Sequence, residues 1–366
     1  MSIHGPMPRS AWIFPALAVL LFAGITALHY SFTPSATGLV FAGLLLLILF
    51  GTVFAAVHHA EVIAERIGEP YGTLLLTLSV TVIEVALIAT IMLGEQVAMT
   101  TLARDTVFAV VMIVCNGLVG ICILAGGLRY REQDIQVTGS SLYLSVLAVL
   151  ATITLIMPSF TATTPGPIYS LGQLGFVSVI TILLYGVFLY TQTVRHRDYF
   201  VIDFAGSAKD GSHASNRIML LSTALLLVSL LAVVLLAKKF SQVVDAGTAL
   251  IGAPPAFAGI VVALLILLPE SVAAVSAARK NDLQKSINLA LGSSLATIGL
   301  TIPAVALAAY ELDKQLVLGL PELDMVLLAL TFVVGMLTLG TGRTNILFGL
   351  VHLVVFAVFM FLVFVP

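Results

Sequence analysis

Two glutamates, Glu84 and Glu270, lie in the middle of long apolar segments, whereas the other acidic residues lie in polar breaks or near segment ends. A charged side chain at the centre of a membrane-spanning helix costs about 2.5–3.5 kcal/mol on insertion scales. No lysine or arginine lies at the same depth, so each carboxyl group must be protonated or must hold a cation. A protonated glutamate hydrogen-bonded between helices is the alternative for either residue alone. Two glutamates in matching places favour a site where a metal cation and protons bind in turn.

Side chains with hard oxygen atoms lie at the same depth, in the segments that carry the glutamates and in the segments that follow them. They are Ser79, Thr81, Asn116, Ser293 and Ser294. Carboxylate, amide and hydroxyl oxygens suit calcium, whereas the sequence has no cluster of histidines and cysteines of the kind that zinc or copper prefers. Small hydroxyl side chains are also common where membrane helices touch, which is the alternative role for the serines and threonines. We therefore expect Glu84 and Glu270 to be the metal ligands, with amide and hydroxyl oxygens around them.

The chemistry expected of such a site follows from its charge. Two ionised carboxylates in a low-dielectric site repel each other, and burial disfavours the charged form of each. One divalent cation neutralises the pair, and so do two protons, so binding of one expels the other. We expect exchange of calcium for protons without a cofactor. Exchange of sodium or potassium for protons through the same glutamates is the alternative.

Three further residues have weaker functional interpretations. His352 is the one histidine deep in an apolar segment, where a packing role is favoured over a proton relay. Glu69 belongs to an acidic helix face at the edge of the membrane, which either draws cations or, as favoured, is simply solvated. Arg343 lies in a glycine-rich turn that it is expected to anchor, with Thr344 or Asn345 capping the helix that follows.

The elements that must position these residues are membrane helices. The chain has 366 residues, and only 9% of them are charged, far fewer than the roughly 25% of a soluble domain. The net charge of −2 gives no basic surface for nucleic acid, so the expected surroundings are a lipid bilayer. Apolar runs predict an all-α polytopic protein with eleven membrane spans. They cover 12–29, 37–57, 72–94, 105–127, 140–158, 169–193, 216–238, 255–278, 282–309, 322–339 and 344–364.

The distribution of basic residues predicts the orientation of these spans. With the N-terminus in the cytoplasm, about three quarters of the lysines and arginines fall on the cytoplasmic side, as the positive-inside rule requires. The same alternation places the C-terminus outside.

The longest polar break divides the chain into two groups of five spans. We expect a cytoplasmic N-terminus and first helix in 1–30, a five-helix repeat in 37–193, a linker in 194–216 and a second repeat in 217–366. Because five is odd, the second repeat must be inverted in the membrane relative to the first. A gapless alignment of the two central spans places Asp105 on Asp282, both as expected helix N-caps, and Asn116 on Ser293.

Enzyme activity is disfavoured by the motifs. A serine protease would need a serine–histidine pair at depth; Ser293 and His352 could be proposed, but nothing in the sequence brings them together. The His-Glu-x-x-His motif of an intramembrane metalloprotease is absent. A channel would not need two titratable carboxylates at the centres of two repeats.

Three stretches, 66–72, 291–297 and 341–345, resemble the bacterial ChaA-type calcium/proton antiporters, in the cation/proton exchanger branch of the calcium/cation antiporter superfamily. The resemblance covers roughly residues 10–366. It implies a first helix followed by two inverted five-helix repeats, with the ion site between their central helices, in the bacterial inner membrane. Carried over, Glu84 and Glu270 look like the two essential carboxylates, and Asn116 and Ser293 like paired polar positions beside them. Members of this type are associated with calcium/proton, sodium/proton and potassium/proton exchange.

The sequence departs from the wider branch at two places. Gly-Asn-Ala before each essential glutamate is replaced by Val80-Thr81-Val82 and by Ile266-Leu267-Leu268. One amide ligand on each side is therefore missing, which leaves room for monovalent cations. The linker also lacks the acidic run found in some relatives, so a calcium-sensing linker is not expected.

Overall fold

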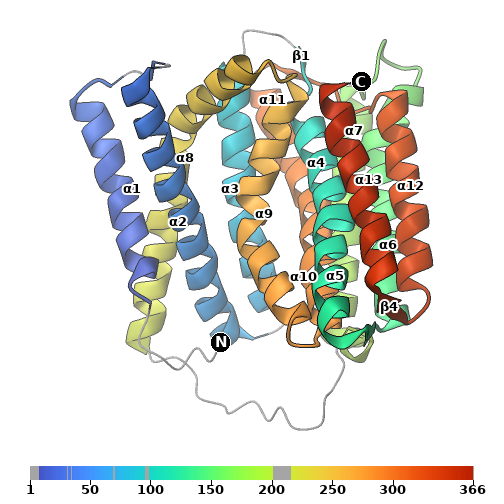
Figure 1. The fold of residues 1–366 in the computed structure, drawn as a ribbon. Coiled ribbons are helices and arrows are strands. Elements are labelled where there is room, and N and C mark those ends of the chain that lie inside the picture. The colour runs from blue at the N-terminus through green and yellow to red at the C-terminus, as the bar shows by residue number, and fades with distance from the viewer. Residues whose placement is uncertain are drawn as a thin grey trace. The chain divides into compact units, whose positions relative to one another are not determined.

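The computed structural model describes residues 8–30, 32–33, 35–68, 71–94, 99–200 and 216–365. Within these residues, eleven helices are long and apolar enough to cross a membrane, and they confirm the eleven predicted spans (Figure 1). The spans are α1 (Ser10–Ala27), α2 (Ala36–Ile67), α3 (Tyr71–Gly94), α4–η1–α5 (Leu102–Met112, Ile113–Leu118, Val119–Tyr130), α6–η2–η3 (Val137–Ala151, Thr152–Ile156, Met157–Phe160), α7–η4 (Leu171–Tyr190, Thr191–Arg195), α8 (Asn216–Ile251), α9 (Ala256–Ala278), α10–η6–α11 (Leu283–Ala296, Thr297–Thr301, Ile302–Glu311), α12 (Glu322–Leu339) and α13 (Ile346–Phe364). Here η1, η2, η4 and η6 are π-helical, whereas η3 and the short η5 (Arg197–Tyr199) are 3-10 helices.

The helices form two compact units that do not coincide with the two halves of the sequence. One unit contains α1, α2, α3 and α8, and the other contains the remaining helices. The order of spans is one leading helix, five spans before residues 201–215 and five after them, as predicted. The sequence boundaries of the two repeats, 37–193 and 217–366, stay a prediction.

The first unit contains the two longest helices, α2 and α8, on which α3 packs. Both helices are longer than predicted: the apolar runs end near 57 and 238, whereas the helices continue to Ile67 and Ile251. Charged residues end an apolar run but do not break a helix. The helices end instead where the backbone turns at Gly68 (φ 77°) and Gly252 (φ 63°), a conformation that glycine adopts without strain.

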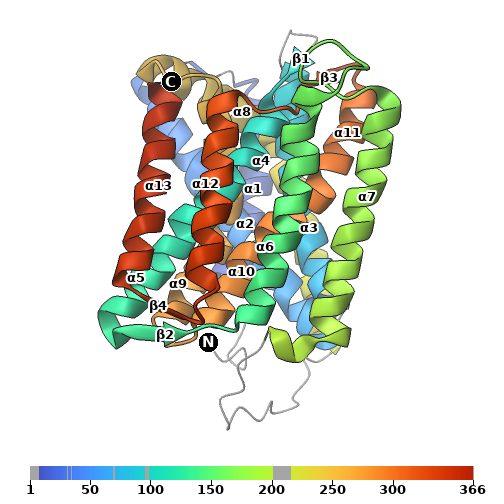
Figure 2. The ribbon, with the colours of Figure 1, turned by 90° about the vertical axis from the view of Figure 1, so that its right-hand side faces the viewer.

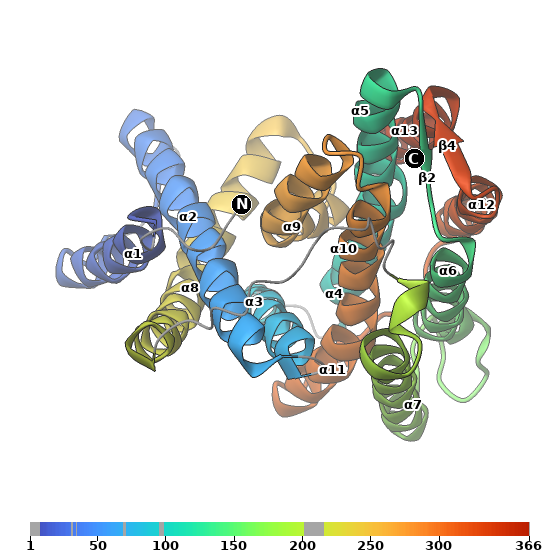
Figure 3. The ribbon, with the colours of Figure 1, turned by 90° about the horizontal axis from the view of Figure 1, so that it is seen from below.

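The second unit is built around two central spans of equal length, α4–η1–α5 and α10–η6–α11, each with a π-helical turn in its middle. Seen from below, α10 passes between α9 and α6, and it contacts both (Figure 3).

Of the two predicted N-caps, one is confirmed and one is wrong. Asp282 caps α10 by accepting a 3.1 Å hydrogen bond from the Lys285 amide. Asp105 lies one turn too late in α4 to be its N-cap, which is Thr101, and instead accepts a 2.8 Å bond from the Thr101 hydroxyl.

A short strand pair closes each end of the second unit (Figure 2). At one end, β2 (Glu132–Asp134), which follows α5, pairs antiparallel with β4 (Arg343–Asn345). At the other end, β1 (Met99–Thr100) pairs in parallel with β3 (Gln315–Leu316), which follows α11. The segment after each central span also contacts the start of the other span: the β2 segment contacts the turn before α10, and the segment after α11 contacts the start of α4. Gln133 Nε2 donates to the Ala278 carbonyl at 3.1 Å, and the Gly319 carbonyl accepts from the Arg104 guanidinium at 3.2 Å.

Candidate functional site

Glu270 lies on α9 at the same depth as the π-helical turn η1. The register is set near the start of both helices, where a Cβ atom on Gly259 would lie only 2.8 Å from the Asp105 backbone. From that contact α9 and α4 run in the same direction (Figure 1). Eleven residues further along each helix, from 259 to 270 and from 105 to 116, lie Glu270 and Asn116. At the rise of an α-helix both positions are about 16 Å from the Gly259–Asp105 contact. Because α9 also packs against η1, the two positions lie at a similar depth on helices that are in contact.

Ser293 reaches nearly the same depth on α10, which returns antiparallel beside α9. Near the turn between the two helices, Ser286 Oγ donates a 2.7 Å hydrogen bond to the Ala274 carbonyl. Seven residues from that bond lie Ser293 on α10 and, counting back, position 267 on α9, so these two are at the same depth. Along the helix axis, Ser293 is therefore within about one turn of the depth of Glu270. A side chain on a helix leans towards the N-terminus, which for Glu270 is the direction of this level.

Ser294, next along α10, is fully buried, and its hydroxyl oxygen has no hydrogen-bond partner among the described residues. Burying a hydroxyl without a partner costs about 1–3 kcal/mol, so such groups are rare and call for an explanation. A cation or a water molecule bound at this depth would supply the missing partner.

Asn116 is also fully buried, but its side chain is satisfied within the second unit. Its amide nitrogen donates a 2.8 Å hydrogen bond to Thr331 Oγ1 on α12. Its amide oxygen lies 3.3 Å from His352 Nδ1 on α13. The other ring nitrogen of His352 lies 3.0 Å from Thr338 Oγ1. The structure thus joins His352 to Asn116 and not to Ser293.

Sequence reasoning missed Thr331 and Thr338 as partners of this buried network. Both are 1% exposed. Their spacing of seven residues puts both on one face of α12, a signal that the sequence does contain. That signal does not say which of the other helices the face meets.

Glu84 lies on α3 in the first unit and is 1% exposed. Thr77 and Thr81 share its helix face, at seven and three residues before it. The Thr81 hydroxyl donates a 2.9 Å hydrogen bond to the Thr77 carbonyl, which leaves the oxygen lone pairs of Thr81 available as acceptors. Ser79 likewise donates to the Leu75 carbonyl at 2.8 Å, but its spacing puts it on another face. The structure therefore brings Thr81, and not Ser79, to the face of Glu84.

The accessory residues have different outcomes. Arg343 anchors its turn as predicted, with its guanidinium 3.0 Å from an Asp134 carboxylate oxygen on the paired strand. Asn345, rather than Thr344, caps α13 by accepting a 3.0 Å hydrogen bond from the Leu347 amide. Glu69 lies outside the described residues.

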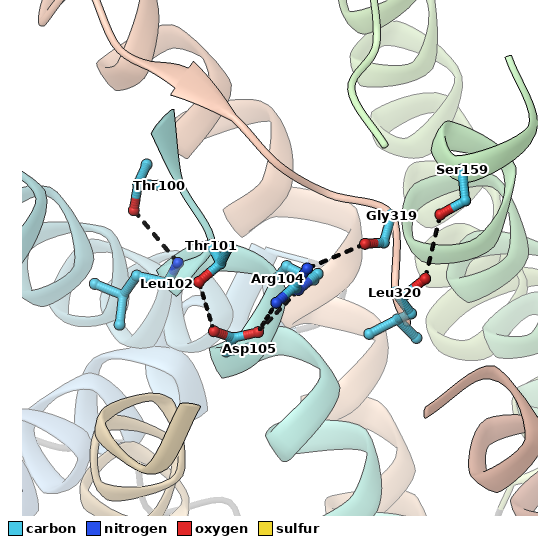
Figure 4. Close-up of polar contacts among 8 residues, drawn as sticks. All are labelled: Thr100, Thr101, Leu102, Arg104, Asp105, Ser159, Gly319 and Leu320. Atoms are coloured by element: carbon cyan, nitrogen blue, oxygen red, sulfur yellow. Dashed lines mark hydrogen bonds and ion pairs between the residues drawn. The ribbon is translucent and has the colours of Figure 1, made fainter. Parts of the chain in front are cut away.

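The opposite end of the second unit has a more buried ion pair (Figure 4). Arg104 contacts Asp105 at 2.8 Å, and the two side chains are only 14% and 10% exposed. The same guanidinium holds the Gly319 carbonyl, while Ser159 Oγ donates to the Leu320 carbonyl at 3.2 Å. These contacts fix the start of α4, and with it the depth of Asn116.

The candidate site differs from a resident metal centre. Among the described residues, no group of three or more histidine, cysteine, aspartate and glutamate side chains is placed to hold a metal ion. The candidate donors are described unit by unit: the first unit carries Glu84 and Thr81 on α3, and the second carries Glu270 on α9 with Ser293 and Ser294 on α10.

Comparison with known proteins identifies the family. The sequence profile described as sodium/calcium exchanger protein matches residues 35–194 and 221–365, which is most of the chain on both sides of the linker. The chain belongs to this exchanger family. The match confirms the resemblance noted in the sequence. It makes the protein a multi-pass membrane cation exchanger that uses no cofactor, and not an enzyme.

Two curated relatives match this exchanger over nearly their whole length. It is 44% identical over 361 residues to y4hA of Sinorhizobium fredii, a protein named for ionic transport, with 98% of this chain and 97% of that protein covered. It is 37% identical to the sodium-potassium/proton antiporter ChaA of Escherichia coli, with 97% and 96% covered.

Solved structures share the fold of this exchanger. Native YfkE superposes with a TM-score of 0.71 at 17% identity, covering 97% of this chain and all of that one. The H+/Ca2+ exchanger CAX superposes with a TM-score of 0.67 at 14% identity, covering 96% and 89%. At these identities the likeness confirms the predicted calcium/cation exchanger fold alone.

Proposed function

We propose that this exchanger is a secondary antiporter that exports calcium in exchange for protons, with Glu84 and Glu270 binding the cation and the protons in turn. The observation that carries the proposal is one glutamate in the middle of each of two membrane helices, α3 and α9, in a chain of a cation exchanger family. An intramembrane carboxyl group is costly unless it is neutralised, and both a cation and a proton neutralise it.

The neighbouring oxygens are proposed as the rest of the site. Thr81 adds a hydroxyl on the face of Glu84, and Ser293 and Ser294 add hydroxyls near the depth of Glu270. Asn116 lies at that depth as well. Ser79 is kept as an outer candidate because it lies on another face of α3. Oxygen ligands of this kind fit a hard cation such as calcium.

Sodium or potassium is the second candidate for the transported cation. The relative at 37% identity is named for sodium, potassium and proton exchange, whereas two relatives named as Ca(2+)/H(+) antiporters are 24% and 23% identical over 63% and 56% of the chain. The missing amide residues before both glutamates also weaken the calcium site. Direct competition between the three cations separates the two candidates.

The proposed setting is the bacterial inner membrane, with the N-terminus in the cytoplasm and the C-terminus outside. The bias of basic residues supports this orientation. The lipid bilayer, the metal cation and protons are then the partners that exchange requires. Accessibility of single cysteines introduced at either end in intact cells would test the orientation.

The decisive experiment measures proton movement in inverted membrane vesicles on addition of calcium, sodium or potassium. Wild type is compared with Glu84→Gln and Glu270→Gln, each of which keeps side-chain size and removes the charge. Glu322→Gln, at the exposed start of α12, is the matched control. We expect both mid-span variants to fall to the background of vesicles without the protein, and the control to match wild type. Normal exchange by either mid-span variant would refute the two-glutamate site. A response to sodium or potassium alone would refute calcium as the cation.

A further inference from the structure

The buried network around Asn116 is a chain of hydrogen bonds with one direction. Thr331 Oγ1 donates to the Leu327 carbonyl at 2.8 Å, so it accepts from the amide nitrogen of Asn116. The amide oxygen of Asn116 can only accept, so with the amide in this orientation the hydrogen bond requires the His352 proton on Nδ1. Nε2 of a neutral imidazole is then an acceptor, and the Thr338 hydroxyl donates to it.

This direction favours one orientation of the Asn116 amide over the other. A flipped amide would place its NH2 group against the Nδ1–H of His352, donor against donor. It would also place its oxygen against Thr331 Oγ1, whose proton would have to leave the Leu327 carbonyl to donate to it. In a fully buried setting each lost partner is costly. The neutral His352 therefore determines which end of the amide faces which helix.

The same helix, α13, supports η1 from behind at close range. A Cβ atom on Gly120 would lie 3.0 Å from the Gly349 carbonyl, and one on Gly117 would lie 3.4 Å from the Phe356 ring. His352 stands between these two contacts along α13. The opposite side of η1 packs against α9 and α10, which carry Glu270 and Ser293. His352 thus holds the one polar side chain of a turn that forms a wall of the proposed cation site.

We propose that His352 is a positioning residue for the exchange site. As a neutral imidazole it fixes the Asn116 amide, and through it the π-helical turn opposite Glu270. This inference rests on the proposed exchange function and adds to it a residue on α13 that does not itself touch the cation. If His352 only filled space, an aromatic ring of similar size would replace it without loss.

Three substitutions separate the two ring nitrogens. The amide nitrogen of asparagine lies as many bonds from the backbone as Nδ1, and that of glutamine as many as Nε2. His352→Asn keeps a hydrogen-bond donor for the Asn116 oxygen. His352→Gln keeps a polar group that reaches only Thr338, and His352→Phe keeps an aromatic ring without a hydrogen-bonding group. His196→Gln, directly after η4, is the control for a histidine outside the network. Initial rates of cation-driven proton movement at varied cation concentration give the apparent KM and the maximal rate.

We expect His352→Gln and His352→Phe to raise the apparent KM for the cation about tenfold, the effect of losing roughly one buried hydrogen bond. Their maximal rates should stay within about twofold of wild type, and His352→Asn should restore the KM to within about threefold. A wild-type KM in His352→Phe, or an asparagine variant no better than the phenylalanine variant, would overturn the inference.

A double-mutant cycle covers variants that fold poorly, with melting temperature in detergent as a second readout. In an Asn116→Ala background, His352→Gln should add no further change to KM or stability, because its partner is already gone. Equal effects in both backgrounds would reject the coupling. If wild type exchanges no cation, the proposed function fails and this inference with it. If Glu270→Gln is inactive while the His352 variants match wild type, only this inference fails.

Discussion

The two central spans of the second unit, α4–η1–α5 and α10–η6–α11, have the same length but place their polar residues differently. In the first, Asn116 lies inside the π-helical turn, and α12 and α13 satisfy its side chain. In the second, Ser293 and Ser294 lie in regular helix just before the turn, and the Ser294 hydroxyl has no partner among the described residues. On the first span, one wall of the proposed site, the polar side chain is thus hydrogen-bonded to the helices behind it. On the second span, the other wall, a hydroxyl oxygen has no such bond among the described residues.

The alignment of these spans shows how far the inverted repeat is exact. The sequence alignment pairs Asn116 with Ser293, whereas alignment on the observed N-caps, Thr101 and Asp282, pairs Asn116 with Thr297. The two solutions differ by one helical turn, so both place Asn116 on the same helix face. The predicted repeat therefore matches helix faces and not individual residues. A cation bound there would therefore meet an asymmetric set of oxygens.

The largest effect that tests this comparison is expected from Asn116→Leu. The substitution removes the hydrogen bonds that Asn116 makes to Thr331 Oγ1 and to His352 Nδ1 in a buried setting, so we expect about 2–4 kcal/mol of destabilisation. Thermal unfolding of the purified protein in detergent checks this, alongside the exchange rate. An unchanged melting temperature would show that the hydrogen bonds of Asn116 to α12 and α13 do not stabilise the protein.

Ser294→Ala is the matched test of the second wall. Removing a buried hydroxyl that has no protein partner should leave stability unchanged within about 1 kcal/mol. If the hydroxyl serves the cation, the apparent KM should still rise about threefold, the worth of a weak ligand. A clear loss of melting temperature with normal transport would instead identify Ser294 as structural.

The ion pairs at the two ends of the unit should also differ. Arg104→Ala leaves the nearly buried Asp105 without its positively charged partner, and we expect a loss of about 1–3 kcal/mol. Arg343→Ala removes a pair whose partners are about 70% exposed, and exposed pairs contribute about 0–1 kcal/mol. Melting temperatures of the two variants, measured at low and high salt, check the order. The reverse order would contradict the role of Arg104 in fixing the start of α4.

Two glycines give the smallest and finest test. Gly120→Ala should destabilise by about 1–3 kcal/mol, because the added methyl group would lie 3.0 Å from a backbone carbonyl of α13. Gly292→Ala places its methyl group 3.7 Å from the Tyr143 hydroxyl, an ordinary contact. It should be neutral or stabilising by up to about 1 kcal/mol, since alanine is the better helix former. Equal losses in both variants would mean that the two walls are equally rigid.

Much of the fold was predictable because membrane insertion depends on local hydropathy. Eleven apolar runs correspond to the eleven described spans, and the Asp282 and Asn345 caps follow from residue type next to a helix start. The ends of α2 and α8 were not predictable in this way, because hydropathy reports where lipid ends and not where helix ends. The Asp105 cap was misassigned because a weak sequence alignment of apolar helices has no landmark finer than one turn.

The sequence by itself determined that this protein spans a membrane, that its family is a cation exchanger family, and that Glu84 and Glu270 lie at mid-depth. Each of these follows from residues close together in the chain or from their order. Only the tertiary structure decided that Asn116 belongs with Thr331 and His352. Those partners lie 215 and 236 residues away. Their meeting depends on how η1, α12 and α13 pack, and no local pattern encodes which polar faces of distant apolar helices come together.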